Sequence, residues 1–269
     1  MRLKYQRFSE KDKLLIKKLT EKGESLKKVS ELFNTGKSAI YYQTRKFRPR
    51  IKKEFISNLN EFKIGELIGA FAGDGDYFHR KYDKNNSSKS SDYRITYYLT
   101  FSKEKEYALY LISMLKSLNL NPHLYSNKSV FIIVVKSKEY AEFIKNYIIW
   151  DKNKTLSIRL KKRITEFSEE FLEGFARGLM DTDGFVESSN VSCACASEKL
   201  IDNLEQILSY FNIKYKRSIK FRAAPRSSLH LIRVYADSLE RYHNLIGFSN
   251  NHKINSLNKI LSNKYHRKS

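Results

Sequence analysis

Apolar residues recur at helical spacing in three short segments near the N-terminus. Residues 9–22 begin with a serine suited to capping a helix, continue with leucine and isoleucine, and stop before Gly23. A second segment starts at Ser25, and a third begins at Lys37, within the turn-forming sequence NTGKS. The pattern predicts three short helices, followed by a basic tail that runs to residue 53.

From about residue 58 the pattern changes and then repeats. The sequences FKIGELIGAFAGDGDYF at residues 62–78 and FLEGFARGLMDTDGFVE at residues 171–187 share a helical apolar pattern, spaced glycines and a final Asp-Gly. After each come alternating strand-like residues, an amphipathic helix, more strands and another helix. An internal duplication explains this order, with each unit reading as helix, two strands, helix, two strands, helix. The sequence therefore predicts an α+β fold.

Three parts are expected along the chain. Residues 1–57 form a helix-turn-helix-like DNA-binding segment with a basic linker, residues 58–164 a first repeat, and residues 165–269 a second. The spacing of the first three helices resembles a helix-turn-helix DNA reader, whose second motif helix spans about residues 37–46. The alternative is a small solvated basic bundle.

The charge of the chain narrows the class of partner. Lys and Arg number 51 against 29 Asp and Glu, a formal net charge of +22. Such an excess of positive charge favours a polyanion as the binding partner, and nucleic acid is the leading candidate. A membrane partner is disfavoured, because the longest pure aliphatic-aromatic run is VFIIVV and no signal peptide precedes Phe8. We expect a cytoplasmic protein, or an organellar or nuclear one in a eukaryotic host. Cys193 and Cys195 are expected to be buried thiols.

Glycines four residues apart predict that the two repeated helices lie side by side. They are Gly65, Gly69 and Gly73 in the first copy and Gly174 and Gly178 in the second, with Thr182 in the next place. Small residues on one face permit close approach of two helices. Asp74 and Asp183 then emerge next to each other, which is costly unless a divalent cation such as Mg²⁺ bridges them. The alternative is a pair of Asp-Gly turns that cap two helices.

At these residues the chain resembles the LAGLIDADG homing endonucleases in their single-chain, two-motif form. LIGAFAGDG (residues 67–75) and ARGLMDTDG (residues 176–184) are similar to the two nine-residue motifs, and the resemblance covers roughly residues 60–269. It implies two pseudo-symmetric αββαββα halves with antiparallel sheets curved over the DNA major groove. It also implies Mg²⁺-dependent double-strand cleavage that leaves short 3′ overhangs, with Mn²⁺ as a substitute, in a monomer that serves intron or intein mobility.

The resemblance also assigns roles to residues. Asp74 and Asp183 occupy the place of the metal-binding acid, and the carbonyls of Gly73 and Thr182 join the metal shells. Lys154, Lys253 and Lys103 are candidates for the basic residues around the attacking water, with Lys154 and Lys253 placed before the last helix of each half. The first motif departs from the pattern at Ala72 and Gly73, and the second at Arg177. Asp76 and Asp181 are expected to be structural.

Apolar and polar residues alternate along two predicted strands, and this pattern suggests how the protein holds DNA. One face would pack on helices while the other presents donors to the groove. The candidate DNA contacts are Arg94, Thr96, Tyr98, Lys214, Lys216 and Lys220 on the strands and Lys37 and Arg45 in the N-terminal segment. The alternative is an ordinary solvent-facing sheet. The polar loop at residues 83–92 is much longer than its counterpart at 188–190, so the double-stranded DNA target is expected to be long and only weakly palindromic.

Other chemistries find no support in the sequence. It lacks a Gly-rich phosphate loop ending in Gly-Lys-Ser/Thr, a Cys/His zinc spacing and a nucleophile elbow. Besides an endonuclease, two alternatives stay open: a non-cleaving DNA-binding regulator, and an intron RNA maturase on the same scaffold. Retention of both Asp74 and Asp183 favours the enzyme.

Overall fold

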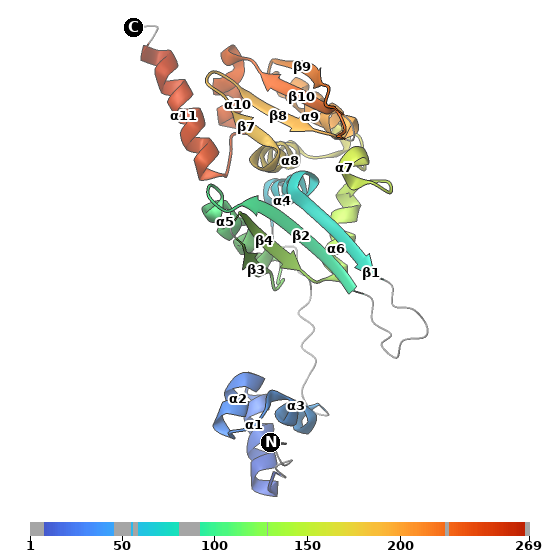
Figure 1. The fold of residues 1–269 in the computed structure, drawn as a ribbon, viewed down its shortest axis with the longest axis vertical. Coiled ribbons are helices and arrows are strands. Elements are labelled where there is room, and N and C mark those ends of the chain that lie inside the picture. Colours follow the sequence, from blue (N-terminus) through green and yellow to red (C-terminus); the bar gives the residue numbers. More distant parts are fainter. Residues whose placement is uncertain are drawn as a thin grey trace. The chain divides into compact units, whose positions relative to one another are not determined.

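The computed structural model of the protein describes residues 8–45, 55, 59–80, 92–127, 129–223 and 226–266 (Figure 1). The chain divides into two compact units, Met1–Lys53 and Glu54–Ser269. The predicted basic tail at residues 46–53 and residues 83–91 of the predicted polar loop lie outside the described residues.

The smaller unit contains the three predicted helices. They are α1 (Glu10–Glu21), α2 (Leu26–Leu32) and α3 (Lys37–Thr44). Ser9 and Asp12 form a capping box at the start of α1, and Gly23 takes a φ of 86° just beyond its end, a backbone conformation that glycine adopts without strain. Ile16, Val29 and Ile40 form a small core of their own.

Two helices pack against each other along their lengths at the centre of the larger unit. Figure 1 shows α4 (Glu61–Asp74) and α8 (Glu169–Thr182) side by side, with one sheet on either side of the pair. A Cβ added at Gly69 would lie 2.8 Å from the backbone nitrogen of Leu179, and one added at Gly178 would lie 2.7 Å from that of Ala70. The predicted pairing of the two helices along their glycine faces is confirmed.

Each motif helix leads directly into a four-stranded antiparallel sheet. The first sheet has the order β1-β2-β4-β3 and the second the order β7-β8-β10-β9. The strands are β1 (Gly75–Arg80), β2 (Asp92–Thr100), β3 (His123–Ser126), β4 (Val130–Val135), β7 (Gly184–Val186), β8 (Val191–Cys195), β9 (Tyr215–Lys220) and β10 (Leu229–Val234). The two sheets thus have the same topology, as the duplication predicts.

Helices cover one face of each sheet. In the first half they are α5 (Lys105–Ser117) and α6 (Lys138–Tyr147), and in the second α9 (Glu198–Tyr210) and α10 (Leu239–Leu245). The last helix, α11 (Asn251–His266), lies beside β7 and α10. The connection between the halves adds short elements that the sequence pattern does not predict: β5 (Ile148–Ile149), α7 (Lys154–Ser157), β6 (Arg159–Leu160) and a 3₁₀ turn, η1 (Ile164–Glu166). A second 3₁₀ turn, η2 (Ala236–Ser238), precedes α10. The predicted α+β architecture is confirmed.

One continuous apolar core joins both halves. It runs from Leu67 and Phe71 on α4 through Phe175 on α8 into the residues under both sheets. Cys193 and Cys195 are free and buried, as expected. In the part of the chain that the structure describes, no helix combines the length and the apolar character needed to cross a bilayer.

Candidate functional site

The two motif acids lie next to each other where the motif helices end. Asp74 is the last residue of α4 and Asp183 is the C-cap of α8. A Cβ added at Gly73 would lie 3.3 Å from the carboxyl carbon of Asp183. The same Cβ would clash with Thr182 Oγ1, so the absence of a side chain at Gly73 permits the close approach of the two helix ends.

Burial disfavours negative charge on both acids, and nearby acids disfavour it further on Asp74. The pKa of Asp74 rises to about 7 because the carboxyl is largely buried and because Asp183 and Glu104 lie near it, while Lys253 and Lys154 oppose the rise. Burial likewise raises the pKa of Asp183 to about 6, against the pull of Lys154. The site therefore holds two carboxyl groups whose ionisation requires additional positive charge.

Two lysines cap the motif helices in equivalent ways. Lys154 Nζ donates to the carbonyls of Ala72 (3.0 Å) and Gly73 (3.3 Å) at the end of α4. At the end of α8, Lys253 Nζ donates to the carbonyls of Met180 (3.1 Å), Asp181 (2.6 Å) and Thr182 (3.3 Å). An ammonium group at this end of a helix is stabilised by the helix dipole.

The positions of these lysines refine the sequence interpretation. They lie in the first turns of α7 and α11, rather than before the last helix of each half. Burial lowers the pKa of Lys154 to about 8 and also lowers that of Lys253. The carbonyls of Gly73 and Thr182, expected to face a metal, accept hydrogen bonds from these ammonium groups.

A pocket of about 210 Å³ adjoins the site. Its lining includes Lys103, Glu104 and Lys253, so the structure brings Lys103 to the same side of the site as Lys253, with its side chain exposed. Glu104 is 8% exposed and accepts hydrogen bonds from the backbone nitrogen of Thr100 (2.6 Å) and from Asn250 Nδ2 (2.9 Å).

Sequence reasoning did not identify Glu104. Its partner Asn250 lies 146 residues further along the chain, so no local spacing connects the two. The only local signal is its position immediately before a predicted amphipathic helix, where Asp, Asn, Ser and Thr are the usual caps and Glu is not among them. The carboxylate nevertheless lies close enough to Asp74 to raise the pKa of that residue.

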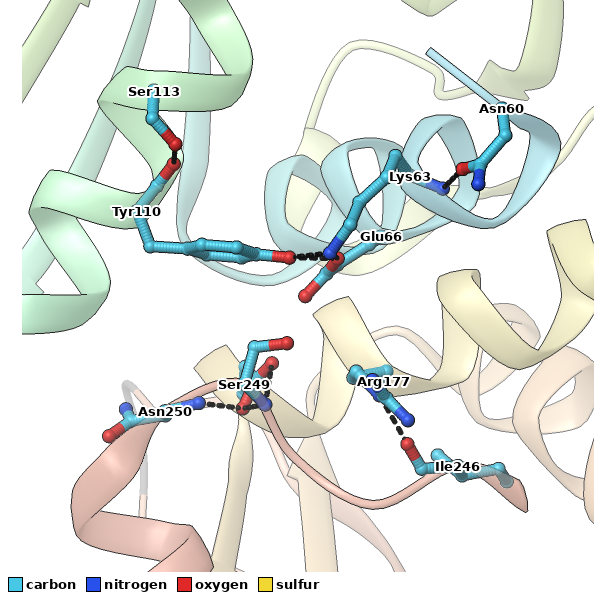
Figure 2. A network of polar contacts seen from close by, with 10 residues as sticks. Asn60, Lys63, Glu66, Tyr110, Ser113, Arg177, Ile246, Ser249 and Asn250 are labelled. Atoms are coloured by element: carbon cyan, nitrogen blue, oxygen red, sulfur yellow. Dashed lines mark hydrogen bonds and ion pairs between the residues drawn. The ribbon is translucent and has the colours of Figure 1, made fainter. Parts of the chain in front are cut away.

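A polar network holds the segment before α11 against the motif helices (Figure 2). Asp181 is fully buried and accepts from the backbone nitrogens of Ser249 (3.0 Å) and Asn250 (2.9 Å). Arg177 donates to the carbonyl of Ile246 in the same segment. These contacts fix the start of α11 and therefore the position of Lys253.

On the first-half side of the network, a buried acid on α4 pairs with two neighbours. Glu66 is fully buried and accepts from Tyr110 on α5 at 2.5 Å and from Lys63 at 3.0 Å (Figure 2). The ion pair and the hydrogen bond, both to Oε2, offset part of the cost of burying this carboxylate, whose Oε1 is buried without a hydrogen-bond partner. They also connect α5, which begins beside Glu104, to the motif helix.

The candidate DNA contacts on the strands lie on the sheet faces opposite the helices, except Lys214. Tyr98 is 44% exposed, and Lys216 and Lys220 are exposed on β9. Thr96 points the same way but is only 3% exposed. Lys214 precedes β9, and its ammonium pairs with Asp237 at 3.0 Å.

Within the smaller unit, α3 carries an exposed face of basic and aromatic residues. Lys37 and Arg45 are exposed at its two ends, and Tyr41 and Tyr42 are 49% and 58% exposed between them. The Arg45 guanidinium lies 5.4 Å from the centre of the Tyr42 ring. These four side chains belong to a different unit from Asp74 and Asp183.

Comparisons with known proteins bear on this geometry. The family model of the LAGLIDADG-like domain matches residues 170–247. The replication factor C small subunit of Methanocaldococcus jannaschii is 26% identical over 207 residues, which are 76% of this chain but only 10% of that protein. The structure of I-DmoI in complex with DNA and Mn has a TM-score of 0.53 at 16% identity, covering 70% of this chain and 98% of that one.

A second structure, I-DmoI with DNA and Ca, has a TM-score of 0.53 at 15% identity and covers 69% of this chain and 89% of that one. The match to the LAGLIDADG-like model falls on the second half, and the structural match confirms the fold. Residues 170–247 of the chain therefore match the LAGLIDADG-like domain, and the chain has the fold of the homing endonuclease I-DmoI.

Proposed function

We propose that this protein is a site-specific endonuclease that hydrolyses both strands of double-stranded DNA. The observation that carries the proposal is the pair Asp74 and Asp183 at the adjoining ends of the motif helices, each with a pKa raised by burial. A protein that only binds DNA gains nothing from holding two carboxyl groups together at this cost. The net charge of +22 supports DNA as the partner.

The donor set suits Mg²⁺, with Mn²⁺ as a substitute. Carboxylate and carbonyl oxygens are hard ligands, and Mg²⁺ is commonly held by one or two carboxylates plus water and substrate phosphate. Among the described residues, no three His, Cys, Asp or Glu side chains form a metal cluster by themselves. Asp74, Asp183 and the carbonyls of Gly73 and Thr182 would hold the ion together with the DNA. When bound, the metal supplies an activated water and neutralises charge that develops on the phosphate.

The chain's own residues orient this chemistry. Ionised Asp74 and Asp183 accept hydrogen bonds from the water that attacks the scissile phosphate. Lys154 and Lys253, held by the helix-end carbonyls, place ammonium groups beside the acids and favour their ionised form. Because the pKa of Lys154 is lowered to about 8, its ammonium can give up a proton near neutral pH. Lys103, exposed at the neighbouring pocket, is a candidate phosphate contact.

The DNA lies across the helix-free faces of the two sheets, and the acids reach one phosphate on each strand. The cut strands carry short 3′ overhangs, the target is long and weakly palindromic, and one chain suffices because it supplies both acids. Such an enzyme would serve the mobility of an intron or intein. We also propose that the larger unit consists of two halves that meet near residue 164.

The smaller unit is a second DNA-binding element in this proposal. The α3 face of Lys37, Tyr41, Tyr42 and Arg45 presents two cations and two aromatic rings without an acid among them. Helices with this chemistry enter the major groove in helix-turn-helix readers. The alternatives for the whole chain are a non-cleaving DNA-binding regulator and an intron RNA maturase, which would need the scaffold but not both acids.

The test is incubation with a randomised duplex library and Mg²⁺, followed by sequencing of the cut ends. We expect ends that share one sequence and are staggered by a few nucleotides with 3′ extensions. The matched control is the same incubation with Asp74→Asn. Selective capture of duplexes without cut ends would favour the regulator, and selective capture of structured RNA would favour the maturase.

A further inference from the structure

The register of the two sheets aligns them position by position, and the alignment exposes a chemical difference between their outward faces. Gly75 follows Asp74 and pairs with Tyr97, and Gly184 follows Asp183 and pairs with Cys193. Tyr97 and Cys193 are therefore equivalent. The strand pairings then give the equivalent residue for every other position in the two sheets. Cross-strand neighbours also share a face of their sheet.

The outward face of each sheet is the one away from the core. Ile95, Tyr97 and Leu99 of β2 and Cys193 and Cys195 of β8 are buried under the helices. The residues between them, such as Tyr98 and Ala194, point to the other side. This outward face begins at the acids in both halves, because β1 and β7 start directly after them, so it is continuous with the candidate site.

On the first sheet an apolar row crosses three strands. Tyr98 pairs with Ile132, which pairs with Tyr125, and the two tyrosines are 44% and 58% exposed. The equivalent row on the second sheet is Ala194, Leu231 and Ser218. The first sheet therefore offers two aromatic rings where the second offers a methyl and a hydroxyl group.

In the neighbouring row of cross-strand residues, the second sheet carries the larger and more strongly interacting side chains. On the second sheet Arg233 pairs with Lys216, and both side chains are exposed. The equivalent residues on the first sheet are Val134 and His123. Glu187 Oε2 lies 3.3 Å from Arg233 Nε on this sheet. The second sheet therefore carries cations where the first carries a valine and a histidine.

We propose that the two arms of the DNA target are read by different chemistry. The first sheet packs Tyr98, Ile132 and Tyr125 against the C5-methyl groups of thymine, the apolar groups that base edges present in the major groove. The second sheet directs Arg233 and Lys216 to the O6 and N7 acceptors of guanine. This inference rests on the proposed function and specifies the substrate: a duplex with one thymine-rich arm and one guanine-containing arm.

The test uses the full chain and duplexes selected for binding without divalent cations, so that no strand is cut. In the selected duplex, thymine is replaced by deoxyuridine, or guanine by 7-deazaguanine, in one arm at a time. Deoxyuridine in one arm should weaken binding about fourfold per contacted methyl group. In the other arm, 7-deazaguanine should weaken binding about tenfold per contacted guanine. Each replacement should have little effect in the opposite arm.

Variants assign each arm to a sheet. Tyr98→Ala or Tyr125→Ala should abolish sensitivity to deoxyuridine only, and Arg233→Ala or Lys216→Ala sensitivity to 7-deazaguanine only. Tyr98→Phe is the matched control, because it keeps the ring and should keep deoxyuridine sensitivity. The inference would be overturned if both arms of the duplex responded alike to the two base replacements, or if a variant changed the sensitivity of the opposite arm. Neither result would contradict the proposed endonuclease activity. A fall in the salt slope by about 0.9 on Arg233→Ala, with 7-deazaguanine sensitivity unchanged, would show a phosphate contact and also overturn it. Failure to select any duplex would contradict the proposed function itself.

Discussion

At the scale of single residues, the candidate site consists of two acids, the two lysines beside them and the buried Glu104. Asp74 and Asp183 follow from two Asp-Gly pairs at the ends of similar helices. Lys154 and Lys253 can be identified as candidates because they occupy equivalent places in the two repeats. Glu104 does not emerge, because its burial depends on contacts between β2, α5 and the start of α11 that only the folded chain creates.

Removing either acid should separate cleavage from binding. In Asp74→Asn or Asp183→Asn one anionic ligand is lost, so metal capture weakens, while repulsion of the DNA phosphate falls. We expect double-strand cleavage to be abolished and affinity without divalent cations to change only modestly. Glu142→Gln, an exposed acid on α6 in a surface ion pair, is the control and should cleave normally. Parental cleavage of both strands by either Asn variant would contradict the assigned site.

The raised pKa values predict a dependence of stability on pH in the absence of metal. A carboxyl whose pKa is about 7 when folded and 3.8 when unfolded binds more protons in the folded state between these values. Its contribution to stability is therefore complete below about pH 4 and is lost as pH rises through 7. We expect Asp74→Asn to raise Tm by several degrees at pH 8 and by little at pH 4, measured by calorimetry in EDTA. An equal effect at both pH values would show that burial of Asp74 does not disfavour its charge.

The same titration governs metal capture. A divalent cation binds the ionised carboxylates, so it must displace any proton held by Asp74 or Asp183. Apparent Mg²⁺ affinity in the presence of DNA should therefore rise with pH through 6 to 7, the pKa values of the two acids, and then level off. Titration of Mg²⁺ against cleavage rate at fixed ionic strength measures this. An Mg²⁺ requirement that is flat from pH 5 to 8 would contradict it.

At the scale of elements, long periodic segments can be predicted and short irregular ones cannot. Apolar residues at helical spacing and glycines four residues apart predict the motif helices, and the alternation of apolar and polar residues predicts the strands. β5, α7 and β6 have two to four residues each, too few to show any period, and they form because Ile148, Ile158 and Leu160 are buried in the core. Side-chain exposure along a strand is likewise set by neighbours, as the 3% exposed Thr96 shows.

The helix pair should tolerate no side chain at its glycines. A Cβ at Gly69 would lie 2.8 Å from Leu179 nitrogen and closer still to the Phe175 carbonyl, both backbone atoms that cannot move aside alone. Gly69→Ala or Gly178→Ala should cost about 1–3 kcal/mol, and the Leu variants more. Gly36→Ala is the control, since nothing lies within 4 Å of its added Cβ. Calorimetry of the full chain and a cleavage assay measure both effects, and an unchanged Tm in the Gly69 variants would contradict the packing.

At the scale of the whole molecule, the sequence predicts a separate N-terminal helical segment but not the residue at which the larger unit begins. The N-terminal helices have their own core of Ile16, Val29 and Ile40, as the pattern of apolar residues indicates. Phe55 lies within the predicted linker, yet its ring packs 5.1 Å from that of Phe143 and 6.4 Å from that of Tyr140. A single aromatic residue in a basic stretch gives no periodic signal, so only the fold reveals that it belongs to the larger unit.

This contact determines how the contribution of the smaller unit is tested. A chain that begins at Glu54 keeps Phe55, both acids and the whole larger core, so it should fold and cut the same phosphates with Mg²⁺. It loses the cations of α3, and each lost phosphate contact should reduce the slope of log affinity against log salt by about 0.9. We therefore expect weaker binding, a shallower slope and a shorter footprint than the full chain gives. The full chain with Lys37→Ala and Arg45→Ala should shift the slope in the same direction without changing the cut positions. An identical slope and footprint for the full and shortened chains would show that α3 does not contact the DNA, and would assign the smaller unit to another partner.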